Sequence, residues 1–264
     1  MIVDPKFIEF AKHLADIAGE ISCKYFRQNF NSNTKNDNSP VTIADKEIEK
    51  TLIKKIKHNF PDHGIIGEEF GSINPNSPYQ WVIDPIDGTK SFVIGAPIFG
   101  NLISLCFEKE PIIGIINQPI NNERWVGIVG EKTTFNGKEI STRKCLEISE
   151  ANFACTSPAY FTGKNAKILQ EIQKKTKFQN NPIYGGDCYL FGLLASGFID
   201  IILETGLKNY DMMALVPIIK GSGGWISDWR GEDINLDSNG NILACGDKRI
   251  YKKLDLYKNY INQQ

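Results

Sequence analysis

The stretch WVIDPIDGTKSF, which runs from Trp81 to Phe92, decides how the rest of the sequence is interpreted. Its apolar start predicts a buried strand, and this strand breaks into two carboxylates, Asp84 and Asp87, with Pro85 between them. Because proline fixes its own φ, we expect the turn to be stiff and the two carboxylates to keep a defined separation.

The residues after the second carboxylate favour a ligand-binding loop. Gly88 lets the backbone approach a ligand closely, and Thr89 supplies a hydroxyl group where a helix can begin. Two acids beside exposed backbone N–H groups suit a divalent cation that bridges the protein to a phosphate. The alternative is an Asx-type turn at the end of a strand, and these residues alone leave both interpretations open.

The composition is that of an ordinary globular protein. The chain has 264 residues, of which 41% are hydrophobic and 23% charged, and its net charge is −1. This length allows one large domain or two lobes. The charge balance provides no electrostatic surface for nucleic acid or an anionic membrane, so we expect neither as a partner. We also find no apolar run of roughly 18 residues and no apolar core of a signal peptide.

The cysteines and histidines do not form a recognisable site. Six cysteines are scattered without a CxxC pair, mostly in apolar surroundings, which predicts buried free thiols rather than disulfides or zinc ligands. The three histidines are too dispersed for a His-rich metal site or a base–nucleophile pair. We therefore expect a reduced, cytoplasmic protein.

Two helices and a short strand are predicted before the central stretch. Apolar spacing predicts a helix over residues 5–29, then a loop over residues 31–40 and a second helix with Thr42 as its N-cap. Asp45 lies in the first turn of that helix, where the helix dipole alone would favour a carboxylate. Gly64 to Gly67 is a predicted strand that ends on Glu68 and Glu69. Side chains alternate faces along a strand, so one of these two carboxylates can face a site.

The remaining elements predict two lobes, residues 1–147 and 148–264. In the first lobe, apolar runs and an Asn136-Gly137 hairpin signal predict an antiparallel meander packed against helices. In the second lobe, strands and helices alternate, which indicates an α/β arrangement. The predicted elements are strands over 100–107, 112–117, 124–129, 152–156 and 198–203, and helices over 165–175 and 188–196; residues 183–184 lead into Gly185-Gly186.

Three acids of the second lobe are candidate site residues. Glu204 ends a predicted strand, and Asp211 follows it before a buried helix that Pro217 is expected to kink. Asp187 precedes another helix, after Gly186. Helix N-capping is the alternative for both Asp187 and Asp211. A capping Asp can still bind a metal, because a carboxylate has two oxygens. We interpret the later run 221–224 as a helix stop, since it lacks the lysine and spacing of a phosphate-binding P-loop.

These motifs resemble the inositol monophosphatase family of Mg²⁺-dependent, lithium-sensitive phosphatases. The resemblance extends from the Thr42–Asp45 segment to Gly224, and its most specific part is the pattern acid-Pro-x-acid-Gly-Thr after an apolar strand, with Glu68-Glu69 upstream. It implies an α+β fold, a layered α/β/α/β/α sandwich, and two to three Mg²⁺ ions, which Mn²⁺ can replace. It also implies inhibition by Li⁺ and a homodimer.

Roles carried over from the family fall on residues already singled out. Glu68, Asp84 and the carbonyl of Ile86 would bind a first metal, and Asp84, Asp87 and Asp211 a second, with Glu68 also serving an outer third ion. Glu68 and Thr89 would orient the attacking water, so that the implied catalytic residues are Glu68, Asp84 and Thr89. Asp45 would contact the ligands rather than a metal. The implied substrate-binding residues are Asp87, Gly88, Thr89, Gly186, Asp187, Glu204 and Asp211.

Within the family, further motifs resemble the histidinol-phosphatase branch. They are Lys90-Ser91-Phe92, Gly95-x-Pro97-x-Phe99-Gly100, Gly114-x-Ile116-x-Gln118-Pro119, Glu123-Arg124-Trp125, Gly185-Gly186-Asp187-Cys188-Tyr189 and Gly206-Leu207-Lys208-x-Tyr210-Asp211. Histidinol phosphate carries an ammonium and an imidazole, with which Asp187 and Glu204 could pair. One departure is Asn209, which stands where the branch often has proline and is expected to loosen the turn before Asp211.

The expected activity is therefore hydrolysis of a small phosphate monoester, histidinol phosphate, in histidine biosynthesis. One alternative is an inositol-1-phosphate or broad sugar-phosphate phosphatase with the same metal site. A nucleotidase is disfavoured, since no added adenine-binding segment is apparent. The non-enzymatic alternative is a metal-binding regulatory or RNA-associated protein on a phosphatase scaffold.

Overall fold

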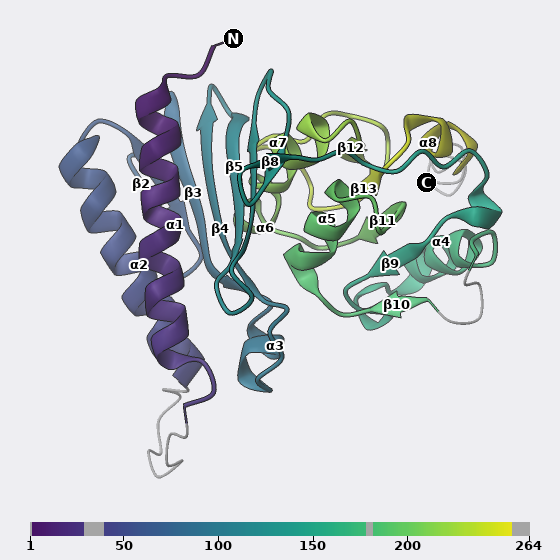
Figure 1. Ribbon diagram of the computed structural model, residues 1–264, viewed down its shortest axis with the longest axis horizontal. Helices are drawn as coiled ribbons and strands as arrows, with labels where there is room; N and C mark the ends of the chain where they lie inside the picture. The colour runs from purple at the N-terminus through teal and green to yellow at the C-terminus, as the bar shows by residue number, and fades with distance from the viewer. Residues whose placement is uncertain (1, 29–39, 178–181, 255–264) are drawn as a thin grey trace.

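The computed structural model describes residues 2–28, 40–177 and 182–254. Two β-sheets and three groups of helices alternate across the molecule, so that its layers are helix, sheet, helix, sheet and helix (Figure 1). The layered α/β/α/β/α sandwich predicted from the sequence is confirmed. Buried apolar side chains fill the space between each pair of neighbouring layers.

The first sheet has the strand order β2-β1-β3-β4-β5-β6-β7-β8. β1 runs parallel to β3, and the strands from β3 onward form the antiparallel meander that the sequence predicts. Asn136 and Gly137 both have positive φ values, 48° and 77°, as the tight turn between β7 and β8 requires. The bounds are β1 Gly64–Gly67, β2 Ser72–Ile73, β3 Tyr79–Asp87, β4 Gly100–Phe107, β5 Glu110–Gln118, β6 Glu123–Ile128, β7 Thr134–Phe135 and β8 Lys138–Glu139.

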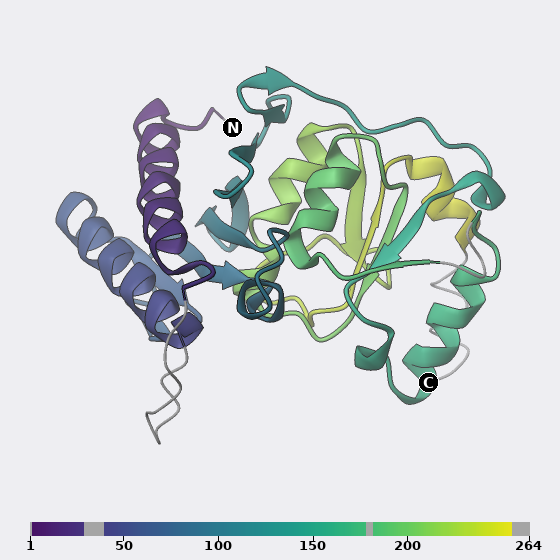
Figure 2. The same cartoon turned by 60° about the horizontal axis from the view of Figure 1, so that its bottom comes forward.

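Helices α1 (Pro5–Tyr25) and α2 (Pro40–Asn59) cover the outer face of this sheet. They lie side by side, as the purple and blue helices of Figure 2 show. The first helix ends before the predicted residue 29. The second begins at Pro40, so the prediction of Thr42 as its N-cap is wrong. Of the predicted loop 31–40, residues 31–39 lie outside the described residues.

The second sheet has the strand order β10-β9-β11-β13-β12. Helices α5 and α7 pack between the two sheets, and α4 and α8 cover the outer face of the second. The strands are β9 Phe153–Cys155, β10 Ile183–Tyr184, β11 Ile201–Glu204, β12 Trp225–Asp228 and β13 Ile242–Cys245. The helices are α3 Thr89–Val93, α4 Gly163–Gln173, α5 Asp187–Ala195, α6 Asn209–Met212, α7 Leu215–Gly221 and α8 Lys248–Leu254, with 3₁₀ turns at Ile148–Glu150 and Pro158–Tyr160.

The predicted kink at Pro217 takes a different form in the structure. The chain makes two short helices, α6 and α7, that are separated by residues 213 and 214. Pro217 lies in the first turn of α7, where a missing N–H group costs no intrahelical hydrogen bond. Helix α7 then ends before Gly223, whose φ is 89°, in agreement with the predicted helix stop.

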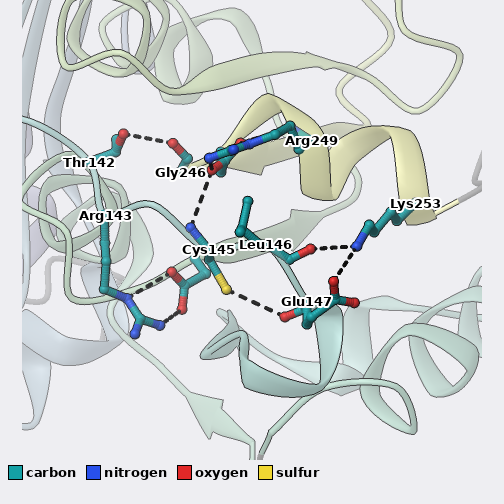
Figure 3. A network of polar contacts seen from close by, with 10 residues as sticks. Thr142, Arg143, Cys145, Leu146, Glu147, Gly246, Arg249 and Lys253 are labelled. Carbon is teal, nitrogen blue, oxygen red and sulfur yellow. Dashed lines mark hydrogen bonds and ion pairs between the residues drawn. The ribbon is translucent and has the colours of Figure 1, made fainter.

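The connector between the two sheets, residues 140–147, is fastened to the end of β13 and to α8 (Figure 3). The Thr142 hydroxyl donates to the Gly246 carbonyl at 2.7 Å, and Lys253 donates to the Leu146 carbonyl at 2.7 Å. Arg143 forms an ion pair with the buried Asp200. Many polar contacts thus hold this segment in place.

All six cysteines are free thiols, as predicted, and five of them are buried; Cys23 is exposed. Across residues 2–28, 40–177 and 182–254, no helix has both the length and the hydropathy of a membrane-spanning segment.

Candidate active site

A β-bulge brings the two aspartates of the central stretch to one side of the sheet. β3 continues through Pro85 to Asp87 instead of ending before Asp84. Against β4, Asp84 is paired with Leu102 and Asp87 with Gly100, so three steps on β3 face two on β4. Side chains alternate faces along a regular strand, and the extra residue turns Asp87 to the side of Asp84. A bulge is also where a central strand tolerates proline.

Asp211 completes a cluster of three carboxylates. Oxygen atoms of Asp84, Asp87 and Asp211 lie within 4.8 Å of one another. Asp211 is the third residue of α6, and one of its oxygens accepts a hydrogen bond from the Lys208 N–H at 2.7 Å. The alternative of Asp211 as the N-cap is therefore wrong. Asn209 does not leave this turn loose, because its side chain donates to the Leu236 carbonyl at 3.0 Å.

The electrostatics of this cluster fit a divalent cation. Asp84 is 2% exposed, and its Oδ1 has no hydrogen-bond partner among the described residues. Burial, followed by the charges of Asp87 and Glu68, raises the pKa of Asp84 well above its ordinary value. Burial also raises the pKa values of Asp87 and Asp211. Crowded carboxylate oxygens of this kind are the ligands that Mg²⁺ prefers, and a cation would remove their mutual repulsion.

Glu68 follows β1 and adds a fourth carboxylate. The residue is exposed, yet partial burial of its carboxyl group, followed by the charges of Asp211 and Glu69, raises the pKa of Glu68 to about 7. Glu49 of α2 holds the turn that carries it, since its carboxylate accepts from the Glu69 and Phe70 N–H groups at 2.8 and 2.9 Å. Glu49 approaches so closely that a Cβ on Gly67 would lie only 1.9 Å from its Oε1.

Asp45 lies one turn before Glu49 on α2 and is 5% exposed. Its Oδ1 finds no partner within the described part of the chain. Burial and the charges of Glu68 and Glu69 raise the pKa of Asp45 to about 8. The structure thus places Asp45 close enough to Glu68 for their charges to interact.

Ile86, Gly88 and Thr89 form the loop between the bulge and α3. The Thr89 hydroxyl donates to the Ile86 carbonyl at 3.2 Å, which leaves that carbonyl a second lone pair. Gly88 is the N-cap of α3 and has a φ of 86°, a conformation that a side chain would strain. The first N–H groups of a helix lack partners within the helix, so they are free to hold an anion.

The first turn of α5, a helix that packs between the two sheets, contacts this loop. The Cys188 N–H donates to Asp87 Oδ2 at 2.6 Å. Asp187 begins the helix with a φ of 44°, and the N-cap is Gly186, so the alternative of Asp187 as a cap is wrong. Asp187 lies close to Gly88, because a Cβ added there would be 2.9 Å from Asp187 Oδ2.

A small pocket of about 50 Å³ extends from the cluster to the second sheet, at Glu204. Glu204 forms part of its wall and is 1% exposed; its Oε1 accepts from the Thr156 N–H at 2.6 Å. The other oxygen is without a partner in the ranges that the structure describes, and burial raises the pKa of Glu204 to about 7. The lining residues are Asp87, Thr156, Tyr160, Asp187, Cys188, Phe191, Glu204, Leu207, Asp211 and Leu215.

Sequence reasoning missed several residues of this site. Glu49 could have been found, because it lies four residues after Asp45 and hence on the same side of the helix. Cys188, Thr156 and Tyr160 carry no comparable signal, since their roles come from backbone N–H groups or from contacts that only the fold creates.

Comparison with known proteins agrees with this geometry. A model of the inositol monophosphatase family matches residues 4–258. The bifunctional phosphatase IMPL2, chloroplastic, of Arabidopsis thaliana is 44% identical over 94% of this chain and 73% of its own length. A histidinol-phosphatase of Chlorobaculum parvum is 31% identical over 90% of this chain and 91% of its own.

Structural similarity extends over the whole fold. An inositol monophosphatase from Zymomonas mobilis has a TM-score of 0.90 and 39% identity, over 98% of this chain and all of that one (100%). A relative of a different name, the Nus factor SuhB of Haemophilus influenzae, is 31% identical over 94% of each chain. The carboxylate cluster, the fold and these matches agree, and the chain belongs to the inositol monophosphatase family of metal-dependent phosphatases.

Proposed function

We propose that this protein is a Mg²⁺-dependent phosphatase that converts histidinol phosphate and water into histidinol and phosphate. The observation that carries the proposal is the acidic pocket beyond the carboxylate cluster, which Asp187 and Glu204 line together with Asp87 and Asp211. Glu204 Oε2 is buried there without a partner in the described residues, as expected of an acid that awaits a donor.

The charge of the pocket favours a cationic ester. Histidinol phosphate has an ammonium group and an imidazole, which can donate charge-assisted hydrogen bonds to Asp187 and Glu204. A neutral polyol phosphate would leave these acids with weaker partners, so the same pocket selects against it.

The residues present also account for the reaction. Asp84, Asp87, Asp211, Glu68 and the Ile86 carbonyl would hold the Mg²⁺ ions. When bound, such ions neutralise the phosphate and lower the pKa of a water molecule. Glu68 and Thr89 orient the water whose oxygen bonds to phosphorus. The backbone N–H groups of Gly88 and Thr89 hold phosphate oxygens while the bond to the histidinol oxygen breaks, and that oxygen takes up the proton that the attacking water loses.

Replacement of Asp187 by Asn tests the choice of substrate. We expect the KM for histidinol phosphate to rise about tenfold or more, because a hydrogen bond to a charged group contributes about 1.5–3 kcal/mol. The KM for inositol 1-phosphate should stay within about twofold. Phosphate release is measured for both esters with Mg²⁺, and Asp237→Asn, in an exposed ion pair, is the control. Faster hydrolysis of inositol 1-phosphate by the unmodified protein would contradict the proposal.

An inositol or sugar phosphatase is the second candidate, since the Zymomonas mobilis relative is named an inositol monophosphatase. A regulatory, RNA-associated role is a third, because one relative is named a Nus factor. The carboxylate cluster of Asp84, Asp87 and Asp211 favours an enzyme over such a regulatory protein. Inhibition by lithium, replacement of Mg²⁺ by Mn²⁺, a homodimer and a cytoplasmic location stay predictions that accompany the proposal.

A further inference from the structure

The β-bulge that carries Asp84 and Asp87 accepts a hydrogen bond from a side chain of the neighbouring strand β4. Asn101 lies between the two bulge partners, Gly100 and Leu102, and its side chain is completely buried. Its Nδ2 donates to the Pro85 carbonyl at 2.6 Å. A bulge disrupts the backbone ladder locally, and buried carbonyls need a donor. The Asn101 amide thus supplies the hydrogen bond that the neighbouring strand cannot.

Asn101 is in turn held by a chain of buried hydrogen bonds. Its Oδ1 accepts from Asn117 Nδ2 at 3.0 Å, and Asn117 Oδ1 accepts from Arg124 Nε at 2.8 Å. Arg124 forms an ion pair with Asp16 of α1 at 2.7 Å. The chain therefore runs from the surface of α1, through β6, β5 and β4, to the loop that carries the carboxylates.

Arg124 and two backbone carbonyls together determine the direction of the bonds in this chain. A guanidinium group can only donate, so the Asn117 oxygen faces Arg124, and the Asn117 amino group donates to Asn101 and to the Ala15 carbonyl at 3.2 Å. The Asn101 oxygen then faces Asn117, and its amino group is left to donate to Pro85. Reversal of either amide would place two donors or two acceptors against each other, which is costly in a buried site.

We propose that Asn101 is a positioning residue for the metal-binding loop, and that Asn117 helps to hold its side chain in the donating orientation. Pro85 lies between Asp84 and the Ile86 carbonyl, so a shift of its carbonyl displaces the groups on both sides. The inference rests on the proposed function, in which this loop binds Mg²⁺. It predicts that loss of the amide weakens Mg²⁺ binding more than it slows the reaction at saturating Mg²⁺.

The test replaces Asn101 by Leu, which has a similar shape but no polar group. We expect the affinity for Mg²⁺, measured by calorimetric titration and by the Mg²⁺-induced rise in Tm, to fall about tenfold, as for partners that orient metal ligands. The Mg²⁺ concentration for half-maximal activity should rise equally, whereas kcat at saturating Mg²⁺ should fall less than about threefold.

Ser22→Ala is the matched control. The Ser22 hydroxyl accepts from the same Asn101 Nδ2 at 2.8 Å and is completely buried, but its own hydrogen bond goes to the Ala18 carbonyl and not to the bulge. This variant should lose stability and keep its affinity for Mg²⁺. An equal loss of affinity in Ser22→Ala and Asn101→Leu would overturn the proposal, because the effect would then follow from stability alone.

Two further outcomes separate this inference from the proposed function. If Asn101→Leu fails to fold, Asn101→Ala, which adds no bulk, is measured in the same way with the same expectation. If the unmodified protein binds Mg²⁺ and either variant binds it equally well, the positioning role is overturned and the proposed function stands. If the unmodified protein binds no Mg²⁺, both are overturned.

Discussion

Asp84 lies among like charges, and this placement is unfavourable for the protein without a bound cation. Its carboxyl group is buried, close to those of Asp87 and Asp211, and its pKa is raised by burial and by its neighbours. Burial of a charge without a partner destabilises the folded protein, so stability alone would favour a neutral residue at this position. At this scale, activity and stability conflict in the same side chain.

Replacement of Asp84 by Asn should therefore separate the two properties. We expect phosphatase activity with Mg²⁺ to fall at least about a hundredfold, because a metal ligand is lost. We expect the Tm in EDTA to rise by about 2–4 °C, because one repelling charge is removed. Phosphate release and thermal unfolding measure the two effects. Asp237→Asn at an exposed ion pair should change neither. A lower Tm for Asp84→Asn in EDTA would show that the cluster is not repulsive.

At the scale of elements, two devices place the carboxylates. The bulge in β3 turns Asp87 to the side of Asp84, and α2 fastens the turn after β1 through Glu49. Glu49 is completely buried, although it is a charged residue on a helix that also faces solvent. Burial of the Glu49 carboxylate is tolerated because its oxygens accept hydrogen bonds from two backbone N–H groups.

Glu49→Ala tests the second device. The change leaves two N–H groups without their acceptor, so we expect a loss of about 2–4 kcal/mol in the free energy of unfolding, measured with urea. The turn with Glu68 should become looser, and the Mg²⁺ requirement for activity should rise. Glu9→Ala, in an exposed ion pair on α1, should cost less than about 1 kcal/mol. Unchanged Mg²⁺ dependence in a destabilised Glu49→Ala protein would refute the link to Glu68.

For the whole molecule, the site is a junction between the two sheets. Asp84 and Asp87 come from β3 of the first sheet, whereas Asp211 comes from α6, which follows β11 of the second. The Cys188 N–H bond to Asp87 adds another link. A cation bound by all three aspartates would hold the two halves together, so metal binding should stabilise the entire fold.

The pH dependence of stability should reveal this coupling. The pKa values of Asp45 (about 8) and Glu204 (about 7) are raised by burial, so the folded protein keeps protons that the unfolded chain has released. Stability in EDTA should fall by about 1–2 kcal/mol between pH 6.5 and 8. Saturating Mg²⁺ should raise the Tm and flatten this decline, because a nearby cation favours ionised Asp45. Parallel Tm–pH curves with and without Mg²⁺ would contradict the coupling.

The sequence predicted much of the site because the chemistry is local. Asp84, Asp87, Gly88 and Thr89 occupy one short segment, and their residue types by themselves indicate a ligand-binding loop. The helices and the meander were also predictable, because apolar periodicity records which face is buried. Errors fell at element boundaries, such as Thr42 and the end of β3, where a cap or a bulge depends on distant contacts.

The sequence by itself determined the family and the acids that can bind a metal, since the motifs that carry them are short segments of the chain. The layered fold followed from the resemblance to that family. Only the tertiary structure decided which groups meet. The bulge that aligns Asp84 with Asp87 requires its partner strand, and the pocket at Glu204 requires the second sheet. The Asn101 amide likewise reaches the Pro85 carbonyl only because β4 lies beside the bulge of β3. Hydrogen bonds of this kind join residues far apart in sequence, and no local pattern records them.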